Sequence, residues 1–229
     1  MTKPLRKPAR TDPAAARDTV ARDIATGAGT RQRALIAALA LFDTQGVDAT
    51  TIEQVRDAAD ISIGSLYHHF RSREGLVGAL YEDLLERYRA VLAAELARHD
   101  TTRALLDAFV ATHIDWSVRN PAAARFLAEH RHHPALQAAE SRLQHGTTDF
   151  LHPLLLRLRP AMTAGILRPL PPELLLSLVI GPVQTWLRMQ RAGHTSLKPA
   201  GAAQKLSDLI WDAIAVPVVI RKATARTAK

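Results

Sequence analysis

A short stretch, residues 50–73, carries the side chains best suited to chemistry: T-T-I-E-Q-V-R-D-A-A-D-I-S-I-G-S-L-Y-H-H-F-R-S-R. Its hydroxyl, imidazole, phenol and guanidinium groups are the kinds that hydrogen-bond phosphate oxygens and base edges. Gly64 lies inside a helical pattern, where glycine costs about 1 kcal/mol relative to alanine. That cost is explained if a phosphate or a base edge must approach the backbone closely. The stretch therefore predicts DNA as a partner.

Two short helices must position these groups. Thr50 followed by Glu53 has the spacing of a capping box, so we expect the first helix to begin there. Ser62 offers a second N-cap. In the helix that follows it, Leu66 and Phe70 are four residues apart and should pack inward, which leaves the other side open to a partner.

On these residues the chain resembles the TetR/AcrR family of bacterial transcriptional repressors. The resemblance runs from about Thr30 to Leu84 and includes the following S-R-E-G-L run at residues 72–76. Two positions depart from the family's usual pattern. Asp60 stands where the family usually has glycine, in a turn that favours a left-handed backbone. Arg73 stands where the family usually has lysine, which keeps the charge but changes the geometry of a phosphate contact.

The resemblance implies roles for individual residues at the DNA. Positions that match the family's phosphate contacts are Thr51, Tyr67, His69 and Arg73. Positions suited to base edges, and hence to sequence preference, are Ser62, Ile63, Gly64, Ser65 and His68.

Composition sets broader limits. The chain has 229 residues, 47% of them hydrophobic, and no cysteine, which predicts a protein of the reducing cytoplasm with a sizeable core. We find no apolar run of about 18 residues, so neither a membrane span nor export is expected.

The net charge of +8 favours a polyanionic partner. However, residues 1–75 hold 11 Lys/Arg against 9 Asp/Glu, so the charge is not concentrated on the predicted DNA-reading part.

No segment alternates with period two for long enough to argue for a sheet, so we predict an all-α fold of about nine helices. A disordered basic arm (1–28) should precede a three-helix helix-turn-helix domain (29–75). A helical effector-binding and dimerisation domain (76–220) and a basic tail (221–229) should follow. Lys3, Arg6, Lys7 and Arg10 in the arm could follow the minor groove, or the arm could be a solvated tail.

Punctuating residues predict the later helices. We expect one helix after Ser72, one after Asp100-Thr101-Thr102, one opening at Asn120-Pro121, and one opening at His133-Pro134 that bends near Pro153 and ends at Pro160. Two more should span about 172–191, with an interruption at Gly181-Pro182, and about 200–220.

In the family, the helices between about residues 76 and 165 would enclose a ligand cavity. Candidate lining residues are Tyr88, Phe109, His113, Trp116, Phe126, His130, Gln184, Trp186 and Met189. Aromatic residues at helical spacing are also what an ordinary core contains. A ligand that favours a dimer whose two DNA-reading helices do not match the separation of the half-sites would release DNA.

The resemblance also implies that the last two long helices form a four-helix bundle with a second copy. Their apolar stripes include Leu174, Leu178, Val183, Leu187, Leu206, Leu209, Ile210 and Ala213. Alternatively, both stripes close the core of one protomer.

Other chemistries have little support in the sequence. The run from Glu129 to His133 contains three histidines, but it lacks cysteines or a known zinc spacing, so we expect no metal and no cofactor. We find no G-x-S-x-G, P-loop or H-E-x-x-H motif, so we expect no enzyme. A regulator of the same fold that acts without a small molecule, through a protein partner or constitutively, or as an activator, stays open.

Overall fold

The computed structural model describes residues 29–130 and 152–217. Within these two ranges the chain forms nine α-helices and no strand, which confirms the predicted all-α fold. The helices are α2 (Thr30–Gln45), α3 (Ile52–Ala59), α4 (Ile63–Phe70), α5 (Arg73–Leu96), α6 (Thr102–Arg119), α7 (Pro121–Glu129), α9 (His152–Thr163), α10 (Pro172–Arg191) and α11 (Pro199–Ile214). The predicted basic arm, the start of a helix at His133-Pro134 and the basic tail lie outside the described residues.

An N-terminal core holds α2, α3 and α4 together. Leu35 of α2, Val55 of α3 and Leu66 of α4 are almost completely buried in it, and the first half of α5 adds Leu76 and Leu80. Spacings of three, four and seven residues place the buried side chains of each helix on one side. The opposite sides of these helices stay at the surface.

The start of α3 differs from the prediction by one residue. Thr51, not Thr50, is the N-cap: its hydroxyl accepts from the Gln54 backbone N–H at 3.3 Å, and the Gln54 side chain accepts from the Thr51 N–H at 2.8 Å. Thr50 is buried instead, and its hydroxyl donates to the Gly46 carbonyl at 2.8 Å. Burial of Thr50 withdraws its hydroxyl from capping.

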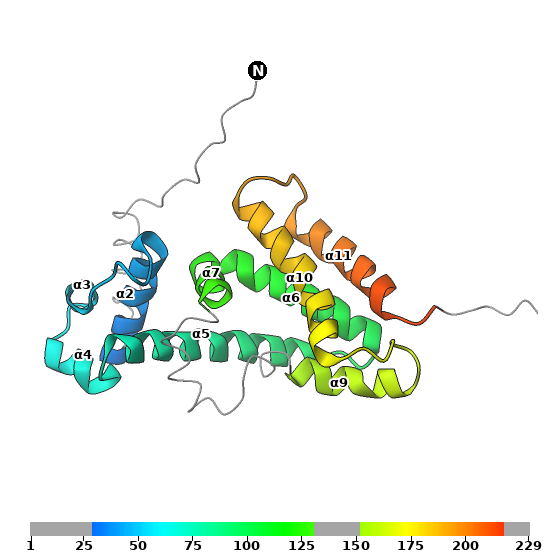
Figure 1. Ribbon diagram of the computed structural model, residues 1–229, viewed down its shortest axis with the longest axis horizontal. Helices are drawn as coiled ribbons and strands as arrows, with labels where there is room; N and C mark the ends of the chain where they lie inside the picture. Colours follow the sequence, from blue (N-terminus) through cyan, green and yellow to red (C-terminus); the bar gives the residue numbers. More distant parts are fainter. Residues whose placement is uncertain (1–28, 131–151, 218–229) are drawn as a thin grey trace, which may run out of the picture.

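The 24 residues of α5 connect the two parts of the molecule (Figure 1). The Ser72 hydroxyl caps the helix as predicted, accepting from the Gly75 N–H at 3.0 Å. At 1.5 Å per residue α5 is about 36 Å long. Its early residues pack with α4, whereas Tyr88 and Leu92 belong to a second, C-terminal core. A displacement of one end of α5 would therefore also move its other end.

The C-terminal core lies between α5, α6, α9, α10 and α11. Helix α6 packs against α5, α10 and α11, and Leu106 and Phe109 are its most buried large side chains. Trp116, near the end of α6, packs against both cores. It is thus a bridge between the two parts.

Three predicted helix limits are wrong. Pro160 lies inside α9, and α10 runs unbroken through Gly181 and Pro182. Both prolines are on exposed sides, where water can reach the carbonyls that lose an N–H partner. Helix α11 ends at Ile214, not near residue 220, because Ala215 leaves the helix to form a β-bridge with Leu167.

Candidate DNA-binding surface and buried polar core

The turn between α3 and α4 sets the position of α4. Asp60 adopts the left-handed conformation (φ 50°, ψ 58°) at the end of α3, the conformation for which glycine was expected. Two residues later the Ser62 hydroxyl accepts from the Ser65 N–H at 3.1 Å and caps α4, as predicted. The two helices are thereby joined by a turn of defined geometry.

The outer side of α4 is open. Leu66 and Phe70 are buried, and on a helical wheel Gly64 and His68 lie opposite them. A Cβ added at Gly64 would meet no atom of the described residues within 4 Å, so none of them obstructs the surface there. Most of the predicted contacts on this helix are exposed, namely Ser62, Ile63, His68 and His69. Tyr67 is 46% exposed and Ser65 is partly exposed. The six predicted contacts on α4 and its cap Ser62 therefore all reach the surface of one short helix.

The position of α4 against α5 depends on a glycine. A Cβ on Gly75 would lie 2.0 Å from the carbonyl oxygen of Phe70, a backbone atom that has little freedom to move. Glycine therefore permits the close approach of the first turn of α5 to the last turn of α4. This contact couples the position of α4 to that of α5.

Arg73 has partners inside the protomer. Its Nε donates to the Thr50 carbonyl at 3.0 Å, another guanidinium nitrogen donates to the Val47 carbonyl, and Asp48 lies 4.0 Å away. The side chain therefore ties α5 to the segment between α2 and α3, a role that the expectation of a phosphate contact did not include. Thr51 is exposed at the N-terminus of α3, where helix N–H groups favour an anion. Sequence reasoning missed Arg71, which is exposed at the end of α4; its charge beside Arg73 was the available signal.

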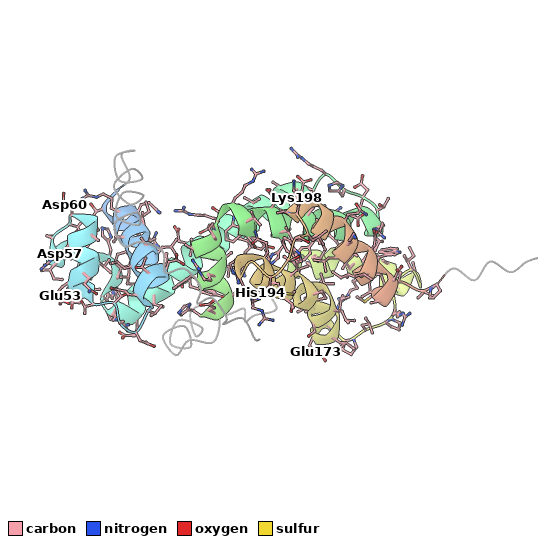
Figure 2. All side chains as sticks on the ribbon, turned by 90° about the horizontal axis from the view of Figure 1, so that it is seen from above. Glu53, Asp57, Asp60, Glu173, His194 and Lys198 are labelled. Carbon is pink, nitrogen blue, oxygen red and sulfur yellow. The ribbon has the colours of Figure 1, made fainter. Side chains whose placement is uncertain are left out.

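One edge of the DNA-reading part is acidic. Glu53, Asp57 and Asp60 project along the outer edge of α3 (Figure 2), and all three are exposed. A row of carboxylates repels a phosphate backbone. This edge is therefore less suited to an anionic partner than the outer side of α4, which carries no carboxylate.

A buried polar chain crosses the C-terminal core. The Tyr88 hydroxyl lies 2.7 Å from His113 Nδ1, and His113 Nε2 lies 3.0 Å from the Gln184 amide. Burial lowers the pKa of His113 to about 4 and raises the pKa of Tyr88 well above its ordinary value, so both are neutral near pH 7. A neutral imidazole has one donor and one acceptor nitrogen, and Gln184 can serve either. The chain thus links α5, α6 and α10 without a net charge.

Only part of the predicted ligand-lining set surrounds this chain. Phe109 stacks on His113 with ring centroids 5.9 Å apart, and Trp116 meets Tyr88 edge-on at 4.9 Å. Trp186 is buried in the same core, and its indole N–H has no hydrogen-bond acceptor among the described residues.

Three other predicted lining residues lie elsewhere. Phe126 belongs to the N-terminal core, where it stacks on Phe42 at 5.8 Å because α7 packs against α2. His130 stacks on Phe126, and Met189 is 44% exposed. The polar groups that lie together in the C-terminal core are therefore Tyr88, His113, Gln184 and Trp186.

The predicted dimer residues divide into two groups. Val183, Leu187 and Ile210 are at most 2% exposed inside the protomer, so they have almost no area to offer a second copy. Leu174 and Leu209 are 46% and 67% exposed. Ala213 is exposed, and Leu178 and Leu206 are partly exposed. The exposed group lies on α10 and α11, which are side by side (Figure 1).

The described residues also bear on other classes of site. No group of three or more His, Cys, Asp or Glu residues there could hold a metal ion. Of the histidine-rich run, Glu129 and His130 are described and residues 131–133 are not. No described helix is long and apolar enough to cross a membrane.

Residues 34–80, which include α3, α4 and most of α2, match the model of the family described as bacterial regulatory proteins, tetR family. This segment, residues 34–80, is of the TetR family. The earlier resemblance is thereby confirmed. The matched residues form most of the N-terminal core described above, including the part that the start of α5 contributes.

Relatives agree with this assignment. The transcriptional repressor KstR2 of Rhodococcus jostii is 39% identical over 94 residues, which cover 39% of this chain and 44% of KstR2. The transcriptional regulator BetI of Paraburkholderia phymatum is 34% identical over 127 residues, which cover 53% of this chain and 63% of BetI. The chain thus matches about half the length of these relatives, which are regulators of transcription and not enzymes.

Solved TetR-family structures share the fold over most of the chain. A TetR-family transcription regulator from Marinobacter aquaeolei superposes with a TM-score of 0.70 at 19% identity, covering 82% of this chain and 96% of that one. The ketosteroid regulator KstR2 of Mycobacterium tuberculosis superposes with a TM-score of 0.62 at 22% identity, with the same coverage.

Proposed function

We propose that this TetR-family protein is a homodimeric, sequence-specific DNA-binding repressor that a small, largely apolar ligand releases from its operator. The observation that carries the proposal is the open outer side of α4, where Gly64 and His68 lie opposite the buried Leu66 and Phe70. Such a protein would act on chromosomal DNA, which places it in the cytoplasm.

In this proposal α4 enters the major groove. Ser65 and His68 face base edges, and Ile63 offers an apolar contact for a thymine methyl. Tyr67 and Thr51 donate to phosphates, and these contacts position the protein without reading sequence.

We assign a further phosphate contact to Arg71. The exposed guanidinium follows directly after α4, whereas Arg73 already donates to two backbone carbonyls. On a defined operator, Arg71→Gln should weaken binding at all related sequences alike and lower the salt dependence by about one phosphate contact. The matched control Arg188→Gln removes an exposed charge from α10 and should change neither.

Dimerisation uses the exposed apolar residues of α10 and α11 in this proposal. Leu174 and Leu209 would be covered by a second copy related by a two-fold axis. Two recognition helices must then match half-sites about 34 to 36 Å apart. A ligand that favours a different separation would release the DNA.

The ligand would enter the C-terminal core near the polar chain. Residues 29–130 and 152–217 offer the buried indole N–H of Trp186 no acceptor, and leaving such a group unpaired costs about 1–3 kcal/mol. A ligand that is apolar apart from a carbonyl group would satisfy it.

The proposal is tested with DNA first. The purified protein is mixed with a random duplex library at two salt concentrations, and bound sequences are enriched. Recovery of a palindrome with half-sites about one helical turn apart supports the proposal. Steeply salt-dependent binding without any enriched sequence would refute it. The recovered operator then serves to screen apolar ketones against hydrocarbons of the same shape for release.

A further inference from the structure

A groove lies where the DNA-reading part meets the rest of the molecule, away from the polar chain. It has a volume of about 570 Å³ and is bordered by α2, α5, α6 and α7, whose positions can be followed in Figure 1. This volume falls within the range of small-molecule sites, about 300–1,000 Å³. The groove is large enough to hold a small molecule.

The floor of the groove is apolar. Leu39 of α2, Leu84 of α5 and Trp116 of α6 contribute to it. Val91 also lines it and is 47% exposed, so an apolar side chain faces water while the groove is empty. Covering these side chains would remove apolar area from water, which favours an occupant with an apolar body.

The polar groups of the groove carry an excess of positive charge. Its charged lining residues are Arg87 of α5, Arg119 of α6 and Asp115 of α6. Arg119 pairs with Asp115 at 2.9 Å, and Arg87 pairs with Asp83, just outside the groove, at 2.9 Å. Side chains of these arginines are 75% and 54% exposed, and ion pairs at such exposure contribute little. Both guanidiniums can therefore turn to a new anion.

We propose that this groove binds a small amphipathic monocarboxylate, with its apolar body on the floor and its carboxylate between Arg87 and Arg119. A guanidinium binds a carboxylate through two parallel N–H···O bonds, a geometry that a neutral amide or an alcohol cannot reproduce. The site is distinct from the polar chain around His113. Trp116 connects the two, since it lines the groove and its ring meets that of Tyr88.

Isothermal titration of the full chain with decanoate and with decanamide, below their aggregation concentrations, tests the site. Wild-type protein should bind decanoate about tenfold more tightly than decanamide, the difference expected for one charge-assisted contact. Arg87→Gln combined with Arg119→Gln should abolish this preference. Asp115→Asn frees Arg119 and should tighten decanoate binding severalfold without changing decanamide binding, a gain that damage to the fold would not produce.

Matched variants locate the binding. Val91→Glu places a carboxylate in the groove and should weaken decanoate binding at least tenfold, whereas Val118→Glu, at a 36% exposed position of α6 outside the groove lining, should leave it unchanged. An unchanged decanoate preference in the double arginine variant, or equal effects of the two glutamates, would overturn the proposal. No DNA is present, so the outcome is independent of the proposed regulatory function.

Discussion

The buried imidazole of His113 makes stability depend on pH. Burial lowers its pKa from 6.5 to about 4 in the folded protein. As the pH falls below 6.5 the unfolded chain takes up a proton that the folded protein still excludes, so protons favour unfolding. The contribution of the neutral His113 imidazole to the free energy of unfolding is complete above about pH 6.5 and declines towards pH 4. Each unit of pKa difference is worth about 1.4 kcal/mol, so His113 should lower the free energy of unfolding by about 2–3 kcal/mol between pH 7 and pH 4.5.

Substitution by glutamine isolates this contribution. His113→Gln retains a polar group for Tyr88 and Gln184 but does not titrate, so the other histidines contribute alike to both proteins. Urea unfolding followed by circular dichroism, at one fixed protein concentration, gives the free energy of unfolding at each pH. The variant should be less stable than wild type at pH 7, and the gap should shrink by about 2–3 kcal/mol at pH 4.5.

An exposed histidine provides the control. His194, labelled in Figure 2, lies at the surface after α10, and His194→Gln should follow the wild-type pH dependence. A His113→Gln curve that also ran parallel to that of wild type would mean that the folded protein does not exclude a proton from His113.

Three further substitutions test other contacts. Gly75→Ala places a Cβ 2.0 Å from the Phe70 carbonyl oxygen and should cost about 1–3 kcal/mol, seen as a lower Tm in calorimetry; an unchanged Tm would contradict the close approach. Asp60→Gly relieves a left-handed non-glycine residue and should raise the free energy of unfolding in urea by up to about 1 kcal/mol, whereas a loss would mean that the Asp side chain stabilises the turn. Leu209→Glu should shift the protein from dimer to monomer in light scattering, while Val118→Glu should not; a dimer that persists would place the interface elsewhere.

Local patterns allowed much of the fold to be predicted. The caps at Ser62 and Ser72 were correct because an N-cap depends on residues within one turn. The capping box of α3 was predicted one residue too early. Two pairs have the required spacing, Thr50 with Glu53 and Thr51 with Gln54, and the sequence alone does not show which of them forms the box. Burial of the Thr50 hydroxyl against Gly46 decides between them, and that is a tertiary contact.

Several predicted site residues have contacts, far away in the sequence, that the sequence alone did not indicate. Arg73 donates to Thr50 and Val47 across the start of the DNA-reading part, so its charge is already engaged. Phe126 shares helical periodicity with core positions, but periodicity does not tell which of the two cores receives it. The same limit applies to Val183, whose apolar stripe fits either a protomer core or a dimer interface.

In the proposed function, the open side of α4 reads base edges. This role is tested by selection of duplexes from a random library by wild type and by Ser65→Ala in parallel, with Tyr67→Phe as the control for a phosphate contact. Wild type should enrich a palindrome. Ser65→Ala should change the preferred base at the same position of both half-sites, whereas Tyr67→Phe should keep the sequence and lose only affinity. Identical enriched sequences for wild type and Ser65→Ala, with a changed sequence for Tyr67→Phe, would contradict the account.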